Sequence, residues 1–331
     1  MSEPMNRREF VAAGVSASVL ASEASAQTGQ PAQPAGQPAQ PAAGDPKKER
    51  IVRLDLLTSR EVGEWIRKND VIFVPHGPIS GHGPWTTLGV HTHGAEAVAT
   101  LLARKCNGLV YPPIFTAFAG ATRMYPGTVP FSYEFHIQIL KATVRSLHTQ
   151  GFGRTFLLCY TNPEDSAGLI AARDLFDIEG ELPVASLVAT RGLTTEAVKK
   201  LLSDYKGSAG EAIIDYAAMR LLGMERTIAE PELARVGLRG GEDQNKEIRD
   251  AVNILRSRGT RGFRYDAERE HSSHGTVGLM YRGRPDIELG LLILDALADH
   301  LLPAVDALRR HKEYLRAHPP RMIERQSPLP P

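Results

Sequence analysis

The chain has 331 residues, with 39 lysines and arginines against 38 aspartates and glutamates, so its formal net charge is +1. This balance gives no electrostatic reason to expect a nucleic acid or an anionic membrane as a partner. The length allows a sizeable core within one large α/β domain.

The first 26 residues have the three parts of an export signal. Arg7 and Arg8 form a pair, residues 11–20 are a short apolar run, and Ala24-Ser25-Ala26 is a small-x-small cleavage pattern. Paired arginines predict the twin-arginine route, and therefore a periplasmic or secreted protein without a membrane contact after cleavage. The alternatives are an amphipathic helix, a disordered tail or a membrane anchor, although the run is well short of the ~20 apolar residues that span a bilayer.

The next segment, residues 27–50, is rich in proline, alanine and glutamine in its first part and ends in a short charge run. Such a composition buries too little apolar surface to offset the entropy of ordering, so we expect a disordered linker. We predict a single α/β domain over residues 51–318, followed by an irregular proline-rich tail over residues 319–331.

Within this domain, short apolar runs alternate with longer amphipathic ones, a pattern typical of a mostly parallel sheet covered by helices. The expected strands are 71–74, 108–112, 155–159 and 182–188. The expected helical segments are 94–105, 133–150, 166–175, a charged region at 190–260, and 289–308, which Pro303 should kink or split. Cys106 and Cys159 lie in or beside apolar runs, and either a disulfide or two free thiols would fit.

Histidines gather in the glycine- and proline-rich stretch after the first expected strand. Four of the chain's 11 histidines fall within 18 residues there, namely His76, His82, His91 and His93. Ligands bind at the carboxyl ends of strands in open α/β sheets. Two adjacent carboxylates, Glu164 and Asp165, follow the third expected strand. Imidazole and carboxylate groups together favour a divalent metal. The plainer alternatives are a histidine that only packs or hydrogen-bonds, and a helix cap at Asp165 or Ser166.

These segments resemble the creatininase family of metal-dependent amidohydrolases. The first loop matches the family at Pro75, Gly77, His82, Gly83, Pro84, Leu88 and Gly89. Further matches in the family's order are residues 125–129, the 151–152 turn, the loop 160–166, residues 239–242 and the late turn 278–285. The resemblance runs from about residue 60 to residue 310. It implies a three-layer α/β/α fold with a mostly parallel central sheet, a small-molecule substrate and a homo-oligomer, with a hexamer as one possible form.

The resemblance also implies where a metal would bind. Family members bind two divalent ions, but here Ser80 stands for the first-loop glutamate, His91 for the bridging aspartate and Asn162 for a histidine ligand. His82 and Glu164 match the remaining ligands. The expected site therefore holds one Zn, Mn or Fe ion through His82, His91 and Glu164, with His76 and His93 in reserve and Asp165 orienting a ligand.

Two functions are compatible with this pattern. The first is a hydrolase with one metal, acting on an amide or cyclic amide C–N bond of a small molecule. In that case Glu164 is either a ligand or the general base. Arg239 lies at the position of the family's catalytic histidine, where it would stabilise an oxyanion or bind a substrate carboxylate. Glu242 matches the family at its own position. The second is a catalytically silent relative that acts as a periplasmic binding or scaffold protein.

Overall fold

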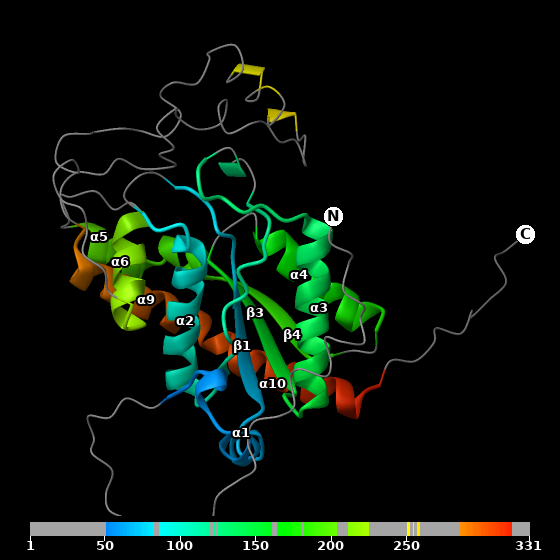
Figure 1. Ribbon diagram of the computed structural model, residues 1–331. Helices are drawn as coiled ribbons and strands as arrows, with labels where there is room; N and C mark the ends of the chain where they lie inside the picture. The colour runs from blue at the N-terminus through cyan, green and yellow to red at the C-terminus, as the bar shows by residue number, and fades with distance from the viewer. Residues whose placement is uncertain are drawn as a thin grey trace, which may run out of the picture. The chain divides into compact units, whose positions relative to one another are not determined.

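The computed structural model describes residues 51–82, 86–119, 122–123, 125–160, 164–179, 182–203, 211–224, 250–251, 254, 257–258 and 285–319. Its strands are β1 (Val71–His76), β2 (Leu109–Val110), β3 (Arg154–Cys159) and β4 (Val184–Val188). Its α-helices are α1 (Ser59–Ile66), α2 (Val90–Cys106), α3 (Tyr133–Thr149), α4 (Glu164–Asp177), α5 (Glu196–Ser203), α6 (Glu211–Leu221), α9 (Ile287–Leu301) and α10 (Pro303–Ala317), with 3-10 helices η1 (Leu54–Leu56) and η3 (Ala189–Thr194). Figure 1 shows their arrangement.

The four described strands form one parallel sheet in the order β2-β1-β3-β4. All six residues of β1 are buried, as are five of the six in β3. Helices therefore cover both faces, which is the usual setting of a parallel sheet. The continuous apolar runs of β1 and β3 follow from this double burial, because neither face of these strands meets water.

The helices form two layers, one on each side of the sheet (Figure 1). Phe73 and Phe156 stack at 5.3 Å between ring centroids and pack in one core with residues of α2, α6 and α9. Ile72 and Leu157 point to the opposite face, where α3 and α4 cover them. Burying each such side chain contributes roughly 1.5–3 kcal/mol. The predicted three-layer fold is confirmed.

Ion pairs join α3 to the end of α4. Lys141 contacts Asp174 at 2.9 Å and Glu179 at 2.7 Å, and Arg145 donates two hydrogen bonds of 2.6 Å to Glu179. These two cations lower the pKa of the Glu179 carboxyl to about 2. The helices that cover this face are thus fixed to each other by charge as well as by apolar packing.

Several element boundaries follow from local signals. Thr58 and Glu61 form a capping box at the start of α1, and Ser132 caps α3 by accepting from Phe135 N. Pro303 stands at the first position of α10, so the expected helix over 289–308 is split there as predicted. Cys106 and Cys159 are not joined by a disulfide.

The start of α2 differs from the expectation. Its first residue is Val90 rather than Gly94, so His91 lies in the first turn of a helix and not in a loop. Gly94, the first residue of the expected helix, lies inside α2, and a Cβ atom there would be 2.8 Å from the ring of Tyr160. The glycine is therefore explained by close packing inside a helix. Of the region 190–260, the described part includes α5 and α6.

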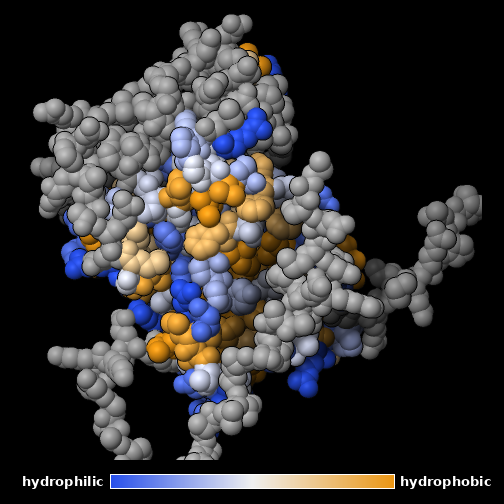
Figure 2. Space-filling view, in the orientation of Figure 1, coloured by the Kyte–Doolittle hydropathy of each residue, from blue (hydrophilic) through white to orange (hydrophobic). Residues whose placement is uncertain are grey.

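Apolar and hydrophilic side chains are interspersed on the face of the molecule in Figure 2. Exposed apolar residues include Val129 and Phe135, at 43% and 47% exposure. None of the described helices combines the length and the apolar character needed to cross a bilayer.

Candidate functional site

The first loop leaves the carboxyl end of β1, and two contacts with a distant segment hold it. Ser80 N donates to Leu88 O at 2.8 Å, which closes the loop on itself. Gly81 N donates to Thr128 Oγ1 at 2.9 Å, and Ile79 forms a bridge with Val129. Residues 125–129, one of the segments with a family-like pattern, therefore support the loop that carries His82.

His82 and His91 lie side by side at this edge of the sheet. Their ring centroids are 4.3 Å apart, and the two residues are only 5% and 4% exposed. The hydroxyl of Ser80 is 2.9 Å from His82 Nε2, and the His91 ring is 5.9 Å from the ring of Tyr160, which follows β3. The structure thus brings together the two imidazoles that the sequence suggested as ligands, and their role in binding a metal stays a prediction.

The other predicted site residues are placed only in part. Glu164 is the first residue of α4, which begins after the carboxyl end of β3. Asn162, Arg239 and Glu242 lie outside the described residues, as do the signal and linker segments. Within the part of the chain that the structure describes, no three His, Cys, Asp or Glu side chains form a metal-binding cluster. Glu164 stays the predicted third ligand of such an ion.

A buried aspartate on α6 contacts the same loop and was not identified from the sequence. Asp215 is fully buried and accepts two hydrogen bonds from Thr87, 2.6 Å from its backbone N and 2.8 Å from Oγ1. Its carboxylate is also 3.6 Å from His93 Nδ1. The sequence feature that could have pointed to Asp215 is that it is the single carboxylate within the otherwise apolar run 212–219. Asp215 therefore connects α6 to the first loop.

A second buried acid lies one helical turn beyond His93 in α2. Glu96 is 1% exposed, and Arg53 Nη1 donates to its carboxylate at 3.0 Å. Burial raises the pKa of Glu96, while Arg53 and His93 oppose that rise. Glu96 and Asp215 thus place two carboxylates near His93, so this reserve ligand lies among acidic groups.

His76, the other reserve ligand, points to the opposite face of the sheet. Its ring meets that of His136 in α3 at 5.0 Å between centroids, in an edge-to-face arrangement. Burial, together with His136, lowers the pKa of His76 well below its usual value of 6.5. Burial lowers the pKa of His136 to about 4. Both rings are therefore neutral at pH 7.

Sequence comparison connects this geometry to a known family. Residues 55–175, which include the first loop, β1 to β3 and most of α4, match the creatininase family, described as creatinine amidohydrolase. This part of the chain is similar to the creatininases. The 3-dehydro-scyllo-inosose hydrolase of Thermotoga maritima is 28% identical over 108 residues, which are 32% of this chain and 35% of that protein. The chain thus matches about a third of the length of this relative.

Solved creatininase structures share the fold. One mutant creatininase has a TM-score of 0.58 at 18% identity, over 82% of this chain and 100% of that one. Another mutant creatininase, complexed with creatine, has a TM-score of 0.57 at 18% identity, over the same shares. A putative creatinine amidohydrolase from Bacteroides fragilis has a TM-score of 0.57 at 20% identity, over 78% of this chain and 97% of that one. The described chain therefore has a creatininase-like fold.

Proposed function

We propose that this protein is a metal-dependent hydrolase of the creatininase type that acts on an amide or cyclic amide C–N bond of a small molecule. The observation that carries the proposal is the buried pair of imidazoles, His82 and His91, 4.3 Å apart between ring centroids where the parallel strands end. Among the similar solved structures, one is a creatininase with Mn and another is a mutant creatininase of the Zn-Zn type. Two nitrogen donors in this position fit a borderline ion such as Zn²⁺, Mn²⁺ or Fe²⁺.

The residues at this edge of the sheet have different roles in the proposed site. His82, His91 and Glu164 would hold one ion, because Ser80 provides a hydroxyl in place of a carboxylate and His91 replaces an acid that could bridge two ions. When bound, such an ion polarises a carbonyl and makes water a stronger nucleophile near pH 7. Ser80 holds the His82 ring through its hydroxyl, and Asp215 anchors the loop through Thr87. In this proposal Glu164 serves either as a ligand or as the general base, and Arg239 and Glu242 complete the site.

The metal content of the purified mature chain tests this proposal. We expect about one first-row ion per chain, because three protein ligands form one open site. His82→Ala and His91→Ala should each lose most of it, whereas His148→Ala, which removes an exposed histidine of α3, should keep it. Elemental analysis by mass spectrometry measures the ratio, and the unfolding midpoint of each variant confirms that it is folded.

Because His82 and His91 are buried, His91→Gln serves as a milder second variant. A folded wild-type chain that contains no metal, and takes up none from micromolar zinc or manganese, would exclude the mechanism. That result would favour the alternative of a catalytically silent binding or scaffold protein with a creatininase-like fold.

We further propose that the mature protein acts outside the cytoplasm after export by the twin-arginine route. The support is the arginine pair, the short apolar run and the Ala24-Ser25-Ala26 motif. We expect the full chain expressed in a bacterium to appear in the periplasm with Gln27 as its first residue, and replacement of Arg7 and Arg8 by lysine to block this. Cell fractionation with N-terminal sequencing decides the matter, and an uncleaved chain in the cytoplasm would contradict it.

A further inference from the structure

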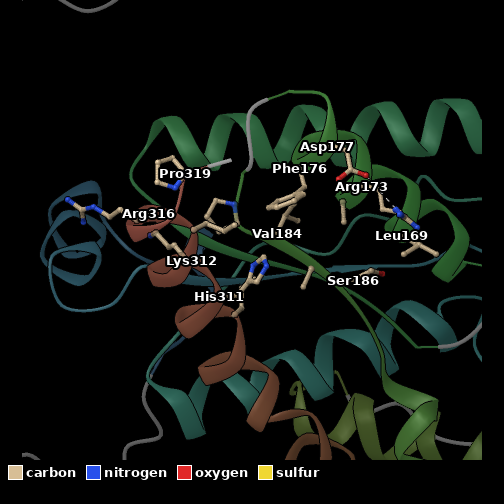
Figure 3. A pocket seen from close by; sticks show the side chains of 15 residues that line it. Leu169, Arg173, Phe176, Asp177, Val184, Ser186, His311, Lys312, Arg316 and Pro319 are labelled. Carbon is tan, nitrogen blue, oxygen red and sulfur yellow. Dashed lines mark ion pairs between the residues drawn. The ribbon is translucent and has the colours of Figure 1, made fainter. Parts of the chain in front are cut away.

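A groove runs along the outer edge of the sheet, away from the histidine pair. β4 is the last strand of the described sheet and pairs with β3 only. On its other side, residues 183–186 form one wall of a cavity of about 700 Å³, with α4 and α10 forming the others (Figure 3). This volume lies within the range of about 300–1,000 Å³ that is usual for small-molecule sites.

The inner surface of this groove is mainly apolar. Phe176 and Leu169 come from α4, and Leu308 and Leu315 come from α10. Leu169 is 49% exposed, a high value for a leucine, while Ala185 on β4 is only half-buried. A hydrocarbon body lying here would remove these surfaces from water, which is favourable in proportion to the apolar area buried.

The rim of the groove is predominantly basic. Arg173, Lys312 and Arg316 line it, with Asp177 as the acidic side chain among the lining residues. Arg173 is 3.7 Å from Asp177, and Lys312 is 2.8 Å from Asp70.

Arg316 differs from these two cations, because it makes no ion pair with any residue that the structure describes. It is an exposed residue near the end of α10, and its side chain extends outward from the groove in Figure 3, from where it can turn toward a bound head group without breaking an internal pair. Guanidinium groups bind carboxylate and sulfonate oxygens through charge-assisted hydrogen bonds.

We propose that this groove binds a small amphipathic anion, with its acidic head at Arg316 and its hydrocarbon body along Phe176 and Leu308. The site is separate from the candidate active site, because its walls come from α4, α10 and the first half of β4, and neither His82 nor His91 lines it. The proposal therefore does not depend on the proposed hydrolase activity. It assigns the fold a second ligand, of a different chemical class from an amide substrate.

Two probes test the groove on the full mature chain. Anilinonaphthalene sulfonate has an aromatic body and an anionic head, and its fluorescence rises when it leaves water. We expect saturable binding of about one probe per chain, and decanoate should displace it. Arg316→Gln should weaken binding about tenfold, since a charged hydrogen bond contributes about 1.5 kcal/mol or more.

Two further variants complete the test. Leu169→Glu, at a half-exposed position, should weaken binding by a similar factor, because it adds a negative charge and removes apolar surface. Arg310→Gln is the matched control, since Arg310 lies on the same helix, pairs with Asp306 and does not line the groove. It should change binding less than about twofold.

Three results would overturn the proposal. They are the absence of saturable binding, probe binding that decanoate does not displace, and equal binding by the wild type, Arg316→Gln and Leu169→Glu. Unchanged unfolding midpoints show that a variant's loss of binding is not a loss of folding. His82→Ala should bind the probe as the wild type does, so a failure of the metal proposal and a failure of this one are distinguishable.

Discussion

Lowering the pH from 7 to 5 should destabilise the protein through two buried histidines, His76 and His136. Neither side chain is exposed, and their ring nitrogens have no hydrogen-bond partner among the described residues. The pKa of His136 is lowered to about 4, and that of His76 lies well below 6.5, in both cases chiefly because burial disfavours the charged ring. The folded chain thus keeps the His136 imidazole neutral at pH 5, and burial opposes protonation of His76 as well.

The direction of the effect follows from proton binding. The unfolded chain takes up protons at these histidines near pH 6.5, whereas the folded chain does not until about pH 4 at His136. Between these values the unfolded state binds more protons, so the free energy of unfolding falls as the pH falls. The stabilisation is fully present above about pH 6.5. By pH 5 the loss should reach about 2 kcal/mol for His136, and the lowered pKa of His76 acts in the same direction.

Urea unfolding of the wild type and His136→Phe at pH 7, 6 and 5 measures this contribution. The variant should unfold at higher urea at pH 7, because phenylalanine removes a buried polar group without a partner, and its pH dependence should be weaker by about one proton. The control, His148→Gln, changes an exposed histidine on the same helix. The raised pKa of Glu96 acts in the opposite direction in all three proteins and cancels from the comparison. Equal slopes for the wild type and His136→Phe would contradict the prediction.

Gly290→Ala should destabilise the protein by about 2 kcal/mol, although alanine is the better helix former. Gly290 lies in α9, where it faces α6. A Cβ atom there would be 2.5 Å from the backbone oxygen of Ile213 and 2.6 Å from the Cβ of Ala217. Since the first of these is a backbone atom, it cannot move aside by rotating a side chain. The two helices would have to separate, and the apolar core beneath them would open.

The same substitution elsewhere provides the control. Gly63 lies in α1, and a Cβ atom there would have one neighbour, the end of the flexible Arg67 side chain at 4.0 Å. Gly63→Ala should therefore raise the free energy of unfolding by roughly 0.5–1 kcal/mol. Chemical denaturation of both variants measures the change in the free energy of unfolding, which should be negative for Gly290→Ala and positive for Gly63→Ala. If both glycines responded alike, the tight contact between α6 and α9 would be disproved.

The parts of the fold that were predictable are those with a local cause. β1 and β3 are continuous apolar runs because a parallel sheet is buried on both faces, and Pro303 divides two helices because it lacks a backbone N–H. The start of α2 was not predictable, since the packing of Gly94 against Tyr160 is a tertiary contact that no local pattern shows.

The candidate site also has a part that the sequence predicts and a part that it does not. His82 and His91 are nine positions apart in a histidine-rich stretch, so their proximity was a reasonable expectation. The contact between Thr87 and Asp215 joins residues 128 positions apart, and an aspartate within an apolar helix does not indicate which loop it meets. Arg239 and Glu242 lie outside the described residues, and their roles stay predictions.

The place of β1 in the sheet has a consequence for folding kinetics. β1 is a central strand, but one of its two partners, β3, follows on the order of 80 residues later, since Val71 pairs with Arg154. At a synthesis rate of about 5–20 residues per second, this apolar strand waits on the order of ten seconds on the ribosome before that partner exists. Folding must also close this long loop before the contact gives any stabilisation, which makes it slow. During synthesis, β1 is therefore a segment at which a chaperone would act and at which aggregation would start.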